Sequence, residues 1–149
     1  MTDHSIKLGN FIANTSYDEL PKNVVDKTKL WIIDTLGVTL AAVNHPSINI
    51  MVDYVKNKCC RKESSIIGYN MMTDCADAAL VNSTAAHALD FDDWHSGGTV
   101  HPGCIVVPTA LALTEKYSLS GIDFLTAVVI GYEVMIRVGS GARAHAHNG

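Results

Sequence analysis

The stretch L-W-I-I-D-T-L-G-V-T-L-A-A-V, residues 30–43, decides the fold class. It continues a helical pattern that begins at Pro21, a residue suited to the first turn of a helix. Apolar side chains fall on every side of such a helix, so we expect it to be buried all round. The apolar run is about 14 residues long, short of the ~20 that a membrane span needs, and Asp34 interrupts it. The stretch therefore predicts a core helix of a globular protein that has no membrane partner.

The rest of the chain is expected to be helical almost throughout. Apolar residues recur at helical spacing on both sides of the opening stretch. The further helices expected cover residues 5–14, 48–55, 73–90, 104–117 and 122–138. A short strand is expected only at S-S-I-I-G-Y, residues 64–69. The pattern predicts an all-α fold with at most one short strand.

Local signals predict where two of these helices begin. Thr73 is expected to cap a helix that carries Asp74 and Asp77 in its first turn. Pro108 is expected either to restrict the 104–117 helix to its second half or to kink it, because proline cannot donate a helical hydrogen bond.

The last helix has a start signal of its own. Ser120 and Asp123 match the [ST]-x-x-[DE] capping pattern. Further along, Glu133 and Arg137 are spaced to form an i, i+4 ion pair. No linker or internal repeat interrupts the chain, so residues 1–149 are expected to form one domain.

Composition excludes several functional classes. The chain has 149 residues, is 48% hydrophobic and carries a net charge of −4, which is typical of a globular protein. Residues 1–70 hold eight basic and seven acidic side chains, whereas residues 71–149 hold three and eight. The chain does not show the extended cationic pattern of a nucleic-acid surface, so no nucleic-acid partner is expected. The first ten residues lack the pattern of a secretory signal, and the expected location is the cytoplasm.

The four cysteines are expected to be free thiols. Cys59, Cys60, Cys75 and Cys104 form no C-x-x-C or zinc-ribbon spacing. Cys59 and Cys60 lie in the basic stretch K-N-K-C-C-R-K, which can lower the pKa of a thiol. No partner histidine or resolving motif accompanies them, and incidental reduced thiols are the simpler interpretation.

The most informative stretch for function is H-A-L-D-F-D-D-W-H-S-G-G-T-V-H, residues 87–101. It contains three aspartates and three histidines, and no lysine or arginine occurs between Lys62 and Lys116. Glycines and a proline break regular structure around it, and apolar helices flank it. Such a cluster of titratable groups is typical of a proton-transfer or metal site.

The spacing suggests how these groups meet. If the 73–90 helix runs to its end, His87 and Asp90 share a face, and a hydrogen bond from the carboxylate would orient the ring. His101 comes just before Pro102 and the expected start of the next helix. Unpaired N–H groups at that start are expected to bind an anionic group.

Simpler interpretations stay open for these residues. An aspartate at a helix end, such as Asp92, is often only a cap or turn residue. His87 on a partly apolar face is often a core histidine. The pattern D-x-D-D-x-H at residues 90–95 offers metal ligands but matches no standard spacing, so neither a metal nor another cofactor is expected. His145 and His147 are expected to lie in a mobile tail that binds transition metals only weakly.

Several segments resemble one family. The stretch A-H-A-L-D-F-D-D-W-H at residues 86–95, followed by H-P-G-C-I-V-V-P-T-A-L-A-L at residues 101–113, resembles the signature of the MmgE/PrpD family. The pattern V-V-D-K-T-K-L-W-I-I-D-T-L-G-V-T-L-A-A at 24–42 and G-Y-E-V-x-x-R-V at 131–138 agree with it. The resemblance implies the N-terminal part of an all-α helical bundle, without the α/β lid domain of full-length members, and a homo-oligomer, usually a homodimer.

The resemblance also implies an activity and site positions. The implied enzyme is a lyase, like 2-methylcitrate dehydratase or cis-aconitate decarboxylase, that acts by proton transfer next to a carboxylate of small di- or tricarboxylic acids. Dehydration, decarboxylation and epimerisation are all open as the reaction. Asp90 and His101 correspond to catalytic positions of the family signature. Asp93 and His95 correspond to positions expected to bind substrate or support the loop.

This chain departs from the family pattern at two positions, and it supplies at most half of such a site. Trp94 replaces a small hydroxyl residue, and Ser83 replaces a glycine. Because of these two replacements, the resemblance does not determine the identity of the substrate. Carboxylate substrates need cations, whereas Asp90, Asp92 and Asp93 make the local field negative. Two alternatives therefore stand beside the enzyme fragment: a non-catalytic helical relic or assembly module, and a small metal-binding protein.

Overall fold

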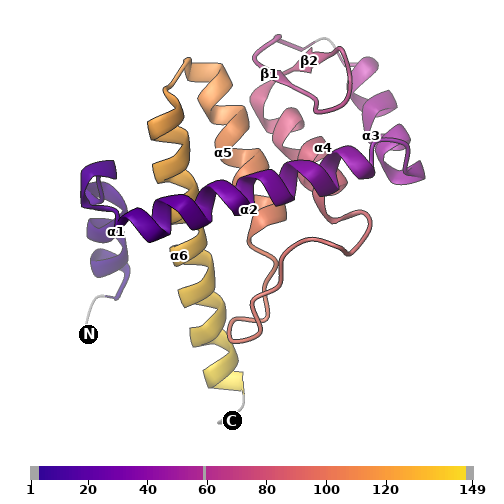
Figure 1. Cartoon of the computed structure of the whole chain (residues 1–149). Helices are drawn as coiled ribbons and strands as arrows, with labels where there is room; N and C mark the ends of the chain where they lie inside the picture. Colours follow the sequence, from indigo (N-terminus) through magenta and orange to yellow (C-terminus); the bar gives the residue numbers. More distant parts are fainter. Residues whose placement is uncertain (1–3, 59, 147–149) are drawn as a thin grey trace.

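The protein is an all-α bundle with one small β-hairpin (Figure 1), which confirms the predicted fold class. The computed structural model describes residues 4–58 and 60–146, with side chains as far as residue 143. The tail histidines and Cys59 fall outside the described side chains. The α-helices are α1 His4–Asn14, α2 Lys22–Ala41, α3 Pro46–Lys56, α4 Cys75–His87, α5 Gly103–Tyr117 and α6 Gly121–Ala146. A 3-10 turn, η1 Tyr17–Glu19, precedes α2, and the strands are β1 Ser64–Ser65 and β2 Met72–Thr73.

Helix α2 crosses over α4, α5 and α6 and contacts all three (Figure 1). Helices α5 and α6 run side by side, joined by a tight turn, and α4 packs on α5. Apolar side chains of α3, the hairpin region and α4 form one cluster, around Ile48, Val52, Ile66 and Val81. A second cluster, around Val107, Val128 and Tyr132, joins α5 to α6. The two clusters fix the ends of α4 and α5, between which the functional loop runs.

Helix α2 is not buried all round, and that expectation was wrong. Leu30, Ile33 and Leu40 have exposed fractions of 59%, 65% and 52%. The buried face of α2 consists of valines and threonines, namely Val25, Thr28, Thr35, Val38 and Thr39. Threonine suits this position because its hydroxyl can bond within its own helix, as Thr39 does to the Thr35 carbonyl at 2.6 Å.

Helix α4 begins and ends one to three residues away from the expected positions. Asp74 caps it by accepting a hydrogen bond from the Asp77 N–H at 3.1 Å, while Thr73 belongs to β2. The helix ends at His87 instead of residue 90. Asp90 has a φ of 50°, in the left-handed region, which a continuing right-handed helix excludes.

The predicted strand is shorter than expected and has a partner. Ser64 pairs with Thr73 and Ser65 with Met72 in an antiparallel hairpin. Asn82 of α4 holds this hairpin, because it accepts a hydrogen bond from the Ile67 N–H and donates one to the Ser65 carbonyl, both 2.9 Å. The second strand was not predicted because two residues show no alternation.

The starts of α5 and α6 test the other local signals. Helix α5 begins at Gly103, so Pro108 does not restrict it to its second half. The Ser120 N–H donates to the Asp123 carboxylate at 2.9 Å and the Asp123 N–H donates to the Ser120 hydroxyl at 3.1 Å, which confirms the capping box. Arg137 bonds Glu133 as predicted. Among the described residues, no helix is both long enough and apolar enough to cross a membrane.

Candidate functional site

The loop between α4 and α5 brings the predicted site residues together. It runs from His87, the last residue of α4, to Gly103, the first residue of α5. His95 and Val100 pair across it, with the His95 N–H donating to the Val100 carbonyl at 2.9 Å. The His95 ring also accepts a 2.9 Å hydrogen bond from the Gly98 N–H through its Nδ1 atom. His95 therefore shapes the loop from within.

The centre of the site is the Asp92 carboxylate, which two imidazole rings share. His87 Nδ1 lies 2.9 Å from Oδ1 of Asp92, and His101 Nδ1 lies 3.3 Å from Oδ2. The Asp92 side chain is 1% exposed, whereas that of His87 is 50% exposed. One buried carboxylate thus faces two histidines that come from opposite ends of the loop.

Asp92 is held as a carboxylate by its neighbours. Burial alone would raise its pKa, but hydrogen bonds from the Cys104 thiol and the His87 ring outweigh burial and hold the pKa below its usual range. Cys104 responds in the opposite direction. Burial, then its hydrogen bond to Asp92 and the charges of Asp92 and Asp93, raise the pKa of the Cys104 thiol to about 12. Cys104 is therefore a neutral thiol and not a nucleophile.

The His101 ring is packed between two other rings. Its centroid lies 4.8 Å from that of His87, edge to face, and 4.8 Å from that of Trp94. Its Nδ1 atom is buried, and among the described residues it has no partner with the alignment of a hydrogen bond. His101 is thereby placed beside Asp92 but keeps one buried nitrogen without a bonded partner.

Asp93 anchors the start of α5. Its carboxylate accepts a hydrogen bond from the Gly103 N–H at 2.8 Å. Burial, reinforced by the charges of Asp92 and Asp34, raises the pKa of Asp93 despite that hydrogen bond. Burial and the charge of Asp93 likewise raise the pKa of Tyr132 in α6. The first N–H of α5, expected to receive an anionic ligand, is thus already occupied by Asp93.

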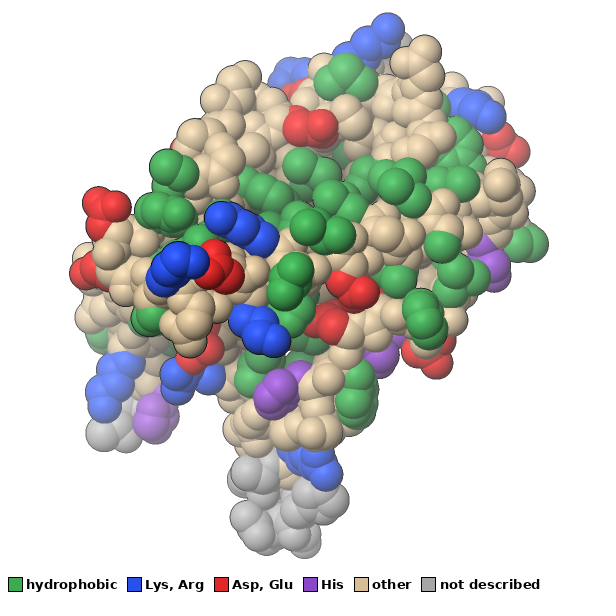
Figure 2. Space-filling model, in the orientation of Figure 1, with side chains coloured by type: hydrophobic (Ala, Val, Ile, Leu, Met, Phe, Trp, Pro, Cys, Tyr) green, Lys and Arg blue, Asp and Glu red, His purple; other side chains and the backbone are tan. Residues whose placement is uncertain are grey.

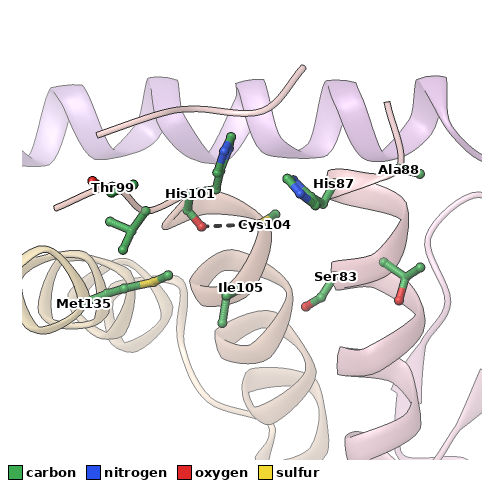
Figure 3. Close-up of a pocket in the computed structure, with 10 residues that line it drawn as sticks. Ser83, His87, Ala88, Thr99, His101, Cys104, Ile105 and Met135 are labelled. Atoms are coloured by element: carbon green, nitrogen blue, oxygen red, sulfur yellow. Dashed lines mark hydrogen bonds between the residues drawn. The ribbon is translucent and has the colours of Figure 1, made fainter. Parts of the chain in front are cut away.

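His87 and His101 line a cavity of about 630 Å³ (Figure 3). Figure 3 shows the two rings at the ends of α4 and α5, with Ser83, Ile105 and Met135 lining the space below them. The full lining is Ser83, Thr84, His87, Ala88, Thr99, Val100, His101, Cys104, Ile105 and Met135. No lysine or arginine is among these described lining residues, so the two histidines are its only cationic groups when protonated.

The structure unites some of the predicted site residues and separates others. One ligating atom each of His87, Asp90, Asp92 and His101 lies within 4.8 Å of the others, so Asp90 and His101 do meet. Asp93 is not among the residues that line the cavity. Neither is His95, whose ring bonds within the loop. The assignment of those two residues to substrate binding stays a prediction.

The residue that bonds His87 was misassigned. The expected pair was His87 with Asp90, but the hydrogen-bond partner of His87 is Asp92. Asp92 is also neither a helix cap nor a simple turn residue, and His87 is not a core histidine, since its ring is half exposed at the cavity. The early end of α4 explains these errors, because it shifts the partner from position i+3 to position i+5.

Comparison with known proteins identifies relatives over most of the chain. The chain is 29% identical over 145 residues to the cis-aconitate decarboxylase-like protein oryM of Aspergillus oryzae. This match covers 90% of the chain and 29% of that protein. Identity is 27% over 139 residues to cis-aconitate decarboxylase of Aspergillus terreus, covering 87% of this chain and 28% of the relative. The chain is 31% identical over 141 residues to cis-aconitate decarboxylase of Homo sapiens. This match covers 91% of the chain and 27% of the relative.

The extent of these matches defines what the chain represents. It spans less than a third of the length of each of these relatives. A family model, that of the MmgE/PrpD N-terminal domain, matches residues 6–149. The match therefore includes all of α2 to α5, with the loop that carries the His87, Asp92 and His101 cluster. The chain belongs to the MmgE/PrpD family and carries its N-terminal domain.

Proposed function

We propose that this chain forms one wall of the active site of a lyase, which transfers a proton at a carbon next to a carboxylate of a small di- or tricarboxylic acid. The observation that carries the proposal is the Asp92 carboxylate, 2.9 Å from Nδ1 of His87 and 3.3 Å from Nδ1 of His101. Both rings line a cavity of about 630 Å³, which has room for an acid of this size.

The residues divide the chemistry between them. An imidazole can both accept and release a proton near neutral pH, and a carboxylate beside Nδ1 favours one ring orientation and leaves the other ring nitrogen for the substrate. His101 is assigned to proton transfer, with Asp90 orienting the substrate or the reacting group. Asp92 is a positioning residue that bonds the His87 ring and lies 3.3 Å from Nδ1 of the His101 ring, and Cys104 stays a neutral thiol at its side.

Charge limits what this wall does alone. Several substrate carboxylates need several cationic or N–H donors, and protonated His87 and His101 are the only cations in the described cavity lining. Asp93 already takes the first N–H of α5. The remaining positive charge is assigned to other segments of an assembled enzyme or to a second copy of the chain.

The relatives favour one reaction of the lyase class. Those named above are cis-aconitate decarboxylases or a protein like them, which supports loss of CO2 from an unsaturated tricarboxylate over dehydration of 2-methylcitrate. Loss of CO2 leaves a carbanion that takes up a proton, the step for which a histidine at the cavity wall is suited. The Trp94 ring, 4.8 Å from the His101 ring, would restrict the space beside this histidine.

The test joins residues 1–149 in frame to the remaining segments of the Aspergillus terreus relative. CO2 release from cis-aconitate and elimination of water from 2-methylcitrate are then measured, with the 149-residue chain alone in parallel. We expect CO2 release by the joined protein and no turnover above background by the chain alone. A folded joined protein without turnover on either acid would contradict the enzyme assignment and favour a helical assembly module. Robust turnover by the chain alone would contradict the proposal that residues 1–149 form only one wall of the active site.

A further inference from the structure

We infer that His87, Asp90, Asp92 and His101 form a binding site for a divalent transition-metal ion of the zinc class. These side chains come from the end of α4 and from the loop that leads into α5. One ligating nitrogen or oxygen of each lies within 4.8 Å of the corresponding atoms of the other three. The inference depends only on this geometry and holds whether or not the proposed enzymatic activity is correct.

The distances are close to those of a coordinated ion. Zinc bound by nitrogen and oxygen at 2.0–2.2 Å places neighbouring ligand atoms of a tetrahedron roughly 3.3 Å apart. Oδ2 of Asp92 lies 3.1 Å from His87 Nδ1 and 3.3 Å from His101 Nδ1. Two of the required spacings are therefore present already. Asp90 lies in an exposed turn, where a small movement can complete the set.

The state of the His101 Nδ1 atom supports the same conclusion. The Nδ1 atom of His101 is buried, faces the Asp92 carboxylate and has no hydrogen-bond partner among the described residues. A buried polar atom in this position costs free energy unless a partner is supplied. An ion between His101 Nδ1 and Asp92 supplies that partner. The same ion takes the place of the proton in the hydrogen bond between His87 and Asp92.

The donor set selects the class of metal. Two imidazole nitrogens and two carboxylate oxygens suit Zn²⁺ and Co²⁺, whereas Mg²⁺ and Ca²⁺ prefer oxygen ligands alone. Cys104 is not among the residues whose ligating atoms cluster here. An imidazole whose Nδ1 is bound to the ion cannot become the doubly protonated ring that the proposed proton transfer requires, so occupation of the site by zinc would block that activity.

The test titrates the untagged 149-residue chain, freed of metal by a chelator, with Co²⁺ and follows its visible absorption. A His145→Ala/His147→Ala variant removes the rival tail ligands and serves as the background for all others. In that background, His87→Ala and His101→Ala each remove one proposed ligand. His87 is half exposed, so its variant leaves the core intact, and circular dichroism checks the fold of each protein.

We expect one Co²⁺ per chain with a tetrahedral spectrum in the tail variant, displaced by Zn²⁺ and unaffected by excess Mg²⁺. Each single-histidine variant should weaken binding by at least about tenfold, the scale of losing even a supporting residue of a metal site. A matched His4→Ala variant, in exposed α1, should bind as the background does. Absence of binding, binding that survives in folded His87→Ala, or binding lost with the tail histidines would each overturn the assignment.

Discussion

The Asp93 carboxylate accepts a 2.8 Å hydrogen bond from the Gly103 N–H and so closes the loop on the first turn of α5. Gly103 lies only two residues after His101, so this bond also fixes where the His101 backbone enters the helix. The two adjacent aspartates have separate tasks: Asp93 positions the helix start, and Asp92 bonds the His87 ring and lies beside the His101 ring. The packing around Gly103 shows how closely the site depends on this anchor.

Replacing Gly103 by alanine is expected to destabilise the fold by about 1–3 kcal/mol, the usual cost of overpacking. A Cβ at this position would lie 2.6 Å from Asp93 Oδ1, 2.7 Å from Thr35 Oγ1 and 2.8 Å from the Tyr132 hydroxyl. Thr35 and Tyr132 are buried and Asp93 is bonded to the Gly103 N–H, so none of the three can move freely. Urea denaturation of Gly103→Ala measures the loss.

The matched control for that variant is Gly9→Ala. A Cβ on Gly9 meets nothing within 4 Å, and the residue lies exposed inside α1. Alanine there should leave the free energy of unfolding unchanged or raise it by up to about 1 kcal/mol, because alanine favours helix more than glycine. Equal stability of Gly103→Ala and Gly9→Ala would contradict the tight packing described around Gly103.

The two aspartates should give stability profiles of opposite slope with pH. Asp92 has a folded pKa below its usual value, so its contribution is present above the unfolded value of about 3.9 and is lost as pH falls through the folded pKa. Asp93 has a raised pKa, so its contribution is present below that value and is lost as pH rises through the folded pKa.

Denaturation of wild type, Asp92→Asn and Asp93→Asn at a series of pH values around 4 measures these slopes. The advantage of wild type over Asp92→Asn should shrink as pH falls, while its advantage over Asp93→Asn should shrink as pH rises. Each unit of pKa displacement corresponds to about 1.4 kcal/mol. Slopes of the same sign for both variants would show that the two carboxylates do not have the contrasting environments assigned to them.

Local signals predicted more of this structure than long-range ones did. The Ser120 and Asp123 capping box was predicted because all of its atoms lie within four residues of one another. The role of Asp92 was not predictable in the same way. It depends on α4 ending at His87 and on the left-handed backbone of Asp90, neither of which a residue pattern required.

The face that α2 buries shows a second limit. The hydrophobic pattern predicted burial of its large side chains, yet threonines such as Thr35 and Thr39 lie inside and Leu30 and Ile33 lie outside. The hydroxyl of Thr35 donates a hydrogen bond to the Trp31 carbonyl at 2.9 Å, which lowers the free-energy cost of burying that hydroxyl. Apolar content identified α2 as a helix but could not determine which neighbours cover it.

Asn82 should be the main polar support of the hairpin. It is 2% exposed and bonds both the Ile67 N–H and the Ser65 carbonyl. Asn82→Ala leaves these two buried backbone groups without partners and should cost about 1–3 kcal/mol or more. The exposed Asn23, near the start of α2, provides the control: Asn23→Ala should change stability by less than about 0.5 kcal/mol. Equal losses in the two variants would rule out the support assigned to Asn82.

The outer face of α2, formed by Leu30, Ile33, Gly37 and Leu40, is expected to mediate self-association. These positions follow helical spacing along one side, and Figure 2 shows apolar side chains in a band along the course of α2. An apolar face of this kind marks an interaction surface. Light scattering should detect a dimer or larger species at micromolar concentration. Ile33→Ser should weaken it, whereas Ile50→Ser, at a 70% exposed position of α3, should not. A monomeric wild-type chain would contradict this prediction.

In the protein joined to the segments of its Aspergillus terreus relative, His101→Ala should lower CO2 release from cis-aconitate by about 10²–10⁴-fold, the contribution of a general acid or base. Asp90→Asn should also reduce turnover sharply, since Asp90 and His101 belong to the same cluster. His4→Ala, in exposed α1, should leave the rate unchanged. Thermal denaturation confirms that each variant is folded before its rate is compared. Full activity of a folded His101→Ala variant would remove His101 from proton transfer and leave His87, which shares Asp92 with it, as the remaining imidazole at the cavity.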